Sequence, residues 1–107
     1  MNFPNDETGQ VLAEMDQAGI DLTQLHDVVF FHLFEQKEQA QAMVDFLSKE
    51  SPETSVIMEA DENPNVWDVN CTINITPTHE NILQQENAFE KIASKFSGYN
   101  DGWGIEA

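Results

Sequence analysis

The segment 66–75 has the clearest periodic pattern in the chain, because apolar and polar side chains alternate from Trp67 to its end. Its apolar positions are Trp67, Val69, Cys71, Ile73 and Ile75, and its polar positions are Asp68, Asn70, Thr72 and Asn74. Successive side chains of a strand point to opposite faces of the sheet, so a period of two predicts a strand with one dry and one wet face.

Three other segments are typical of strands. Residues 25–34 carry apolar side chains on both faces, which favours a central strand covered on both sides. Residues 54–58 form a short candidate strand, and residues 99–105 form a terminal strand or hooked segment. If the wet face of 66–75 continues across its neighbour 25–34, either the N-terminal helix or a partner protein must cover the apolar side chains there.

Three segments have the spacing of amphipathic helices. The first is capped by Asn5 or Asp6 and ends at Gly19, a residue that commonly terminates helices. The second covers 37–49 and is broken by the Ser51-Pro52 pair. The third begins after a cap at Thr78 and runs to about residue 96, with an apolar stripe along one side.

After the first helix, the expected order is strand, helix, strand, strand, helix, strand. This is the split βαβ order of the ferredoxin-like fold, an α+β sandwich with two helices on one face of an antiparallel sheet. The N-terminal helix is an addition to that sandwich. A length of 107 residues is typical of a single domain, so we expect one domain over residues 1–107.

The charge balance restricts the class of partner. Twenty acidic residues stand against four lysines, with no arginine, and the formal net charge is −16. Nucleic-acid affinity comes largely from cations that neutralise phosphates, so we expect this chain to repel RNA, DNA and anionic membranes. Long-range attraction should instead steer it towards basic proteins. No segment approaches the ~20 apolar residues that a membrane-spanning helix needs.

Motifs for catalysis, cofactors and metals are missing from the sequence. His26 and His32 would stand roughly 20 Å apart on one strand, too far to share a metal ion. The acidic segment 61–72 begins like a calcium loop but lacks the glycine and the final glutamate of that motif. The lone cysteine, Cys71, alternates inward and suits a core thiol in a reducing compartment. We therefore expect no enzyme activity, no cofactor and no metal site.

The most specific motif lies near the C-terminus. Lys95-Phe96 is followed, four residues later, by Asp101-Gly102-Trp103-Gly104. An Asp-Gly pair favours a tight reversal, and Gly104 allows the backbone to approach closely beside the indole of Trp103. Trp103 is interpreted both as a plug at the edge of the core and as an anchor for a partner.

This motif resembles the family called regulator of ribonuclease E activity B. Upstream, Gly19-Ile20-Asp21 and the strand around 28–33 resemble the helix, turn and first strand of that family. At Asn100 the chain departs from the pattern, since the family usually has an aromatic residue before Asp-Gly-Trp-Gly. The resemblance implies a bacterial cytoplasmic protein with a ferredoxin-like fold that binds ribonuclease E and restrains RNA cleavage.

Two hypotheses about function follow. In the first, an acidic non-catalytic protein binds ribonuclease E, a basic partner, and inhibits or modulates it. The residues expected at that interface are Tyr99, Asp101, Gly102, Trp103, Gly104, Glu80, Glu86 and Glu90. In the alternative, a ferredoxin-like domain senses a ligand or binds another protein. Its wet face then lines a pocket or a dimer interface with Asp68, Asn70, Thr72 and Asn74. The oligomeric state stays open at this point.

Overall fold

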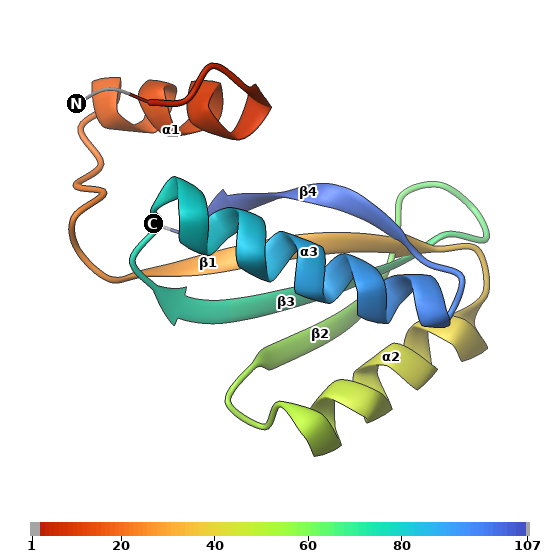
Figure 1. Ribbon diagram of the computed structural model, residues 1–107. Helices are drawn as coiled ribbons and strands as arrows, with labels where there is room; N and C mark the ends of the chain where they lie inside the picture. Colours follow the sequence, from red (N-terminus) through yellow and green to blue (C-terminus); the bar gives the residue numbers. More distant parts are fainter. Residues whose placement is uncertain (1–2, 107) are drawn as a thin grey trace.

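A computed structural model describes residues 3–106 as an α+β fold with three helices and a four-stranded antiparallel sheet (Figure 1). Residues 1, 2 and 107, the ends of the expected domain, lie outside the described part. The first helix, α1, spans Glu7–Gln17. The Asp6 carboxylate caps it by accepting a hydrogen bond of 2.7 Å from the backbone N–H of Gly9. The predicted end is confirmed, because Gly19 follows the helix with a φ of +95°.

The four strands are β1 (His26–Phe34), β2 (Ser55–Ala60), β3 (Trp67–Ile75) and β4 (Tyr99–Ile105). They are arranged in the order β2-β3-β1-β4, and each neighbouring pair is antiparallel. The prediction that β1 is a central strand is confirmed, since β3 and β4 flank it. In the unit β1-α2-β2, strand β3 lies between β1 and β2. In the unit β3-α3-β4, strand β1 lies between β3 and β4.

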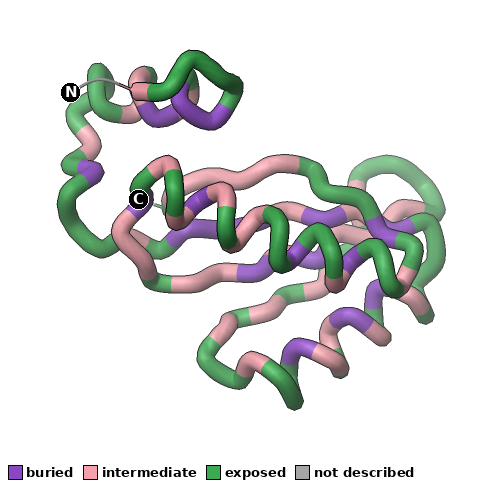
Figure 2. Tube along the Cα trace, viewed as in Figure 1, coloured by how far each residue is buried: buried purple, intermediate pink, exposed green. Residues whose placement is uncertain are grey.

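Helices α2 (Lys37–Glu50) and α3 (His79–Lys95) cover one face of this sheet. The hydroxyl of Thr78 caps α3 as predicted, accepting a hydrogen bond from the Asn81 N–H at 3.1 Å. Buried positions recur along α2, α3 and the central strands (Figure 2). The core beneath the helices consists of Val28, Phe30, Phe34, Ala40, Met43, Leu47, Val69, Cys71, Ile82, Phe89 and Ala93.

The opposite face of the sheet, its open face, carries neither α2 nor α3. Its side chains alternate with the core positions along each strand. They are Val29, Phe31 and Leu33 on β1, Ile57 and Glu59 on β2, Asp68, Asn70 and Thr72 on β3, and Tyr99, Asp101 and Gly104 on β4. Of the two alternatives for covering this face, the N-terminal helix packs against α3 instead (Figure 1), and cover by a partner protein stays a prediction.

A contact between helix ends explains where α1 lies. Asp6 caps α1 and also pairs with the His79 imidazole, with 2.8 Å between Oδ2 and Nε2. The hydrogen bond from Gly9, followed by the one from His79, lowers the pKa of Asp6. His79 is the first residue of α3, so a single carboxylate joins the starts of the two helices.

The C-terminal motif folds differently from the tight reversal expected at Asp101-Gly102. The chain instead turns just after α3, where Ser97 has a φ of +66°. Asp101 and Gly102 lie inside β4, and the register with β1 shifts there, between Phe30 and His32. A positive φ of +100° at Gly102 accommodates this bulge, because glycine adopts that conformation without steric cost.

Candidate protein-interaction site

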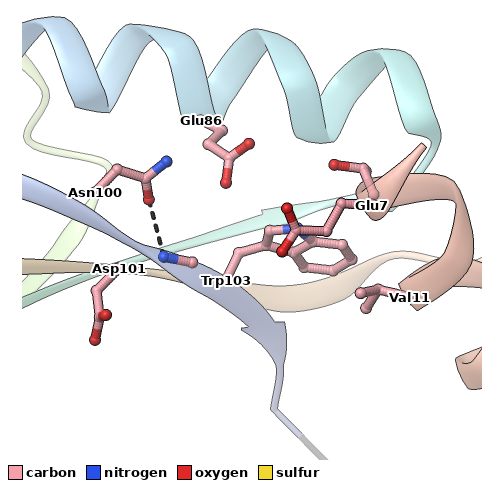
Figure 3. A pocket seen from close by; sticks show the side chains of 8 residues that line it. Glu7, Val11, Glu86, Asn100, Asp101 and Trp103 are labelled. Carbon is pink, nitrogen blue, oxygen red and sulfur yellow. Dashed lines mark hydrogen bonds between the residues drawn. The ribbon is translucent and has the colours of Figure 1, made fainter.

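The bulge in β4 divides the sequence-predicted site residues between the two faces of the sheet. Trp103 pairs with Phe30 and packs against the core on the helix side. Tyr99 pairs with Leu33 on the open face. In Figure 3, Asn100 points towards α3 whereas Asp101 points away from it. The motif therefore supplies side chains to two different surfaces.

On the helix side, α1, α3 and β4 enclose a hollow of about 430 Å³ (Figure 3). Trp103 forms part of its wall and Glu86 reaches into it from α3. The lining residues are Glu7, Thr8, Val11, Glu86, Asn100, Asp101, Gly102 and Trp103. The hollow therefore combines an aromatic wall with carboxylates, and it suits an apolar or cationic group of a partner.

Asn100, the position that departs from the family pattern, stabilises the bulge. Its side-chain carbonyl accepts a hydrogen bond of 2.9 Å from the backbone N–H of Gly102. Asparagine side chains commonly bond the backbone two residues further along in this way. The same side chain borders the hollow, so Asn100 contributes both to the bulge and to the lining.

The three glutamates predicted on α3 are not brought together. Glu86 is partly buried and belongs to the hollow. Glu80, in the first turn, and Glu90, four residues after Glu86, are exposed and lie outside the lining. Gly104 is not needed for close approach to an indole, because the nearest atom to an added Cβ would be Phe31 Cε2 at 3.8 Å.

Sequence reasoning missed the contribution of α1 to the hollow. Glu7 and Val11 lie more than ninety positions before Trp103, and no local pattern connects them. The one available signal was His79, which opens α3 beside the capped start of α1. His79 has no histidine four residues later and so no zinc-site spacing, and the structure uses it to pair with Asp6.

Lysines do not neutralise the carboxylates within the part of the chain that the structure describes. Among residues 3–106, the ion pair of His79 with Asp6 stands alone, and no lysine pairs with a carboxylate. Two of the four lysines lie over aromatic rings instead. Lys37 Nζ is 5.3 Å from the ring centroid of Trp67, and Lys95 Nζ is 5.3 Å from that of Phe46. The negative surface is thus available to a cationic partner.

This unpaired charge predicts that salt stabilises the protein. Raising NaCl from low to moderate concentration screens repulsion between carboxylates. We expect the melting temperature to rise by about 5 °C, which corresponds to roughly 1 kcal/mol for a domain of this size. Thermal unfolding followed by circular dichroism checks this. A flat or falling melting temperature contradicts it.

His32 lies on the core side of β1 with only 1% of its surface exposed. Its Nδ1 donates a hydrogen bond of 3.3 Å to the carbonyl of Val69, and its ring packs edge-on against Phe89. Burial lowers the pKa of His32, although the hydrogen bond to Val69 and the negative charges of Glu90 and Asp101 oppose this effect. His32 is therefore a core residue that stays neutral at neutral pH.

The lowered pKa makes the free energy of unfolding depend on pH. Below about pH 6.5 His32 is protonated more in the unfolded chain than in the folded protein. The free energy of unfolding therefore decreases as the pH falls. We expect His32→Gln to show a smaller loss of stability between pH 7 and pH 5 than the wild type. Urea unfolding across that range measures it, with His26→Gln as the control. If the free energy of unfolding changes equally with pH in the wild type and in His32→Gln, protonation of His32 is not the cause of the pH dependence.

Metal or nucleophilic chemistry finds little support in the geometry. Within residues 3–106, no group of three or more histidine, cysteine, aspartate or glutamate side chains is placed to hold a metal ion. The Cys71 thiol is buried in the core, and burial raises its pKa to about 12, so it is a poor nucleophile. In the same part of the chain, no helix is long and apolar enough to span a bilayer.

Comparison with known families decides the assignment. Residues 5–105 match the family described as Regulator of ribonuclease activity B. The chain belongs to this family. The matched residues include every helix and strand, so the family resemblance is not confined to the C-terminal motif. A search of curated protein sequences gave no match. Membership of this family makes the protein a regulator of ribonuclease activity and implies a ribonuclease as its partner.

Proposed function

We propose that this protein binds ribonuclease E and restrains its cleavage of RNA without catalysing a reaction. The observation that carries the proposal is the combination of the family match with a surface on which no lysine pairs with a carboxylate in the described residues. Proteins that process RNA bind its phosphates with lysine and arginine. An acidic protein can occupy such a cationic surface in place of RNA.

The hollow beside Trp103 supplies a second kind of contact, because a large aromatic side chain can anchor a partner in a partly dehydrated pocket. Its rim carries Glu7 and Glu86, which can pair with a cation next to the anchor. The exposed carboxylates of Glu80 and Glu90 contribute steering rather than close contacts. Gly102 borders this hollow, whereas Tyr99, Asp101 and Gly104 would contact the partner on the opposite face of the sheet.

We expect Trp103→Ala to weaken binding to ribonuclease E by about 2 kcal/mol or more. Because Trp103 packs on the core, the same change should lower the free energy of unfolding by about 3 kcal/mol. Trp103→Phe separates the two effects, since a smaller ring retains most of the packing and costs roughly 1 kcal/mol. If Trp103→Phe and Trp103→Ala both remain folded and bind as tightly as the wild type, Trp103 is no anchor.

The framework that presents this interface is proposed to be ferredoxin-like and to form one domain. The order β2-β3-β1-β4, with α2 and α3 on one face, supports the ferredoxin-like assignment. A single core cluster that draws on both helices and the central strands supports one domain. The bacterial and cytoplasmic setting of ribonuclease E is part of the same proposal.

Purified ribonuclease E provides the direct test. Titration calorimetry at low and at moderate salt should show binding that weakens as salt rises, because charged contacts are screened. A parallel assay should show slower cleavage of a single-stranded RNA substrate when the protein is added. Absence of binding at both salt concentrations would refute the proposal. A ligand-dependent rise in melting temperature with a metabolite collection would favour the ligand-sensing alternative instead.

A further inference from the structure

We propose that the open face of the sheet is a docking surface for an arginine-bearing segment of a protein partner, in which guanidinium groups lie over Phe31 and Tyr99 and pair with Asp68 and Asp101. This inference rests on the proposed function for the identity of the partner, but not for the chemistry of the surface. It assigns a second surface, across the sheet from the hollow that contains Trp103.

The register of the strands places the relevant side chains in adjacent rows. Leu33 on β1 lies between Asp68 on β3 and Tyr99 on β4. Glu59 on β2 extends that row beyond Asp68. In the next row, Phe31 stands opposite Asn70 on β3, and Ile57 on β2 follows. Phe31, Leu33 and the neighbouring Tyr99 therefore form an apolar strip with carboxylates on both sides.

Apolar side chains on this strip are accessible to solvent. Tyr99 is 57% exposed and Phe31 and Leu33 are half-buried, whereas Val29 at the far end of β1 is only 6% exposed. Ile57, beyond Asn70 on β2, is a further exposed apolar side chain at 51%. Glycine at position 104 leaves the ring of Phe31 uncovered on the β4 side, since any larger residue there would place its Cβ against that ring. Exposed apolar side chains gathered on one face are typical of an interaction surface.

The electrostatics of the strip identify the occupant as cationic. Partial burial raises the pKa of Asp68, and the neighbouring carboxylate of Asp61 raises it further. Asp101 and Glu59 act on Asp68 in the same direction. No lysine pairs with these groups in residues 3–106. A guanidinium placed between Asp68 and Asp101 would relieve the mutual repulsion of the carboxylates.

Arginine fits this surface better than lysine does. Its planar guanidinium stacks on aromatic rings and pairs with carboxylates through two parallel hydrogen bonds, whereas the ammonium of lysine is a strongly hydrated point charge. A second copy of the chain is disfavoured as the occupant, because it would bring Asp68 and Asp101 of two copies together. RNA is disfavoured because its phosphates meet the same carboxylates.

The test uses the intact protein and a fluorescein-labelled peptide of alternating arginine and alanine, with binding read by fluorescence anisotropy. A matched peptide carries citrulline, an uncharged residue of nearly the same shape, in place of each arginine. A short labelled single-stranded RNA reports any direct binding of nucleic acid. The proposal predicts binding of the arginine peptide, much weaker binding of the citrulline peptide and no binding of the RNA.

Matched variants separate local docking from general charge attraction. The double variant Asp68→Asn/Asp101→Asn and the control Glu14→Gln/Glu50→Gln each remove two carboxylates and change the net charge from −16 to −14. We expect the first to weaken peptide binding by about tenfold and the control by less than about twofold. Equal losses in the two double variants would overturn the proposal.

A second pair of variants tests the apolar strip. Ile57→Lys places a cation on the open face, whereas Leu25→Lys places one at a residue that is 64% exposed before β1 begins. Both add one positive charge at an exposed apolar position. We expect Ile57→Lys to weaken peptide binding by about tenfold and Leu25→Lys by less than about twofold. Unchanged binding by Ile57→Lys would contradict the proposal.

Repeating these titrations with ribonuclease E separates the two proposals. If the wild type binds ribonuclease E and every open-face variant binds it equally well, the open face is not the docking surface and the proposed function stands. If the wild type binds the arginine peptide through the open face but does not bind ribonuclease E, the partner is another arginine-bearing protein. Binding of the RNA in place of the peptide would overturn the inference.

Discussion

Phe30→Ala is expected to lower the free energy of unfolding by about 3–5 kcal/mol. Phe30 is 1% exposed on the helix side of β1, and its ring lies 5.3 Å from that of Phe89, measured between centroids. Removing it leaves a cavity at the centre of the core that neighbouring side chains fill only in part. Chemical unfolding in moderate salt, where charge repulsion is screened, gives the value.

Phe31→Ala is the control for that prediction. Phe31 is the next residue along the chain, but it lies half-buried on the open face. We expect it to cost about 1 kcal/mol, because only part of its surface is removed from water. Similar losses for the two variants would mean that the sheet is covered on both sides, which contradicts the assignment of an open face.

Gly98→Ala is expected to lower the free energy of unfolding by about 3 kcal/mol, at the upper end of the usual cost of overpacking. An added Cβ would lie 2.5 Å from Cζ of Phe34 and closer still to Cε2. Phe34 is fully buried, so its ring has no free space to move into. Thermal and urea unfolding both measure the effect.

Gly104→Ala provides the matched control within the same C-terminal segment. The nearest atom to its added Cβ is 3.8 Å away, which is an ordinary van der Waals contact. We expect stability to change by less than about 0.5 kcal/mol. A large loss at Gly104 with little change at Gly98 would show that the turn after α3 packs differently from the arrangement described.

Much of the fold could be predicted from local patterns. Period-two alternation identified β3, and a run of apolar residues identified β1 as a central strand. Capping chemistry identified the starts of α1 and α3 at Asp6 and Thr78. These signals are local, and each depends on residues only a few positions apart, so a single sequence contains them.

The sites were less predictable because they depend on contacts between distant segments. Asp101-Gly102 reads as a reversal in isolation, but pairing with β1 turns it into a bulge that sends Trp103 and Asp101 to opposite faces. α1 lies against α3 with Leu12 buried and Asp6 in contact with His79, and no short-range pattern reveals these contacts. The sequence therefore indicated the C-terminal motif, but not that it serves two surfaces.

The apolar side chains on the second face of β1 are explained if a partner covers the open face. A strand that is apolar on both faces requires cover on both faces, and the helices cover only one face of β1. The remaining apolar strip is flanked by carboxylates, and cover by a partner protein stays a prediction. On this account the chain is complementary to a cationic protein surface and not to a nucleic acid.

A displacement experiment tests this central claim most directly. A catalytically inactive ribonuclease E is loaded with labelled single-stranded RNA, and this protein is titrated in while the anisotropy of the RNA is followed. The account predicts that RNA is released as the protein binds, that added salt weakens the effect and that the protein alone leaves the anisotropy of free RNA unchanged. RNA that stays bound to ribonuclease E, or RNA that binds this protein directly, would contradict the account.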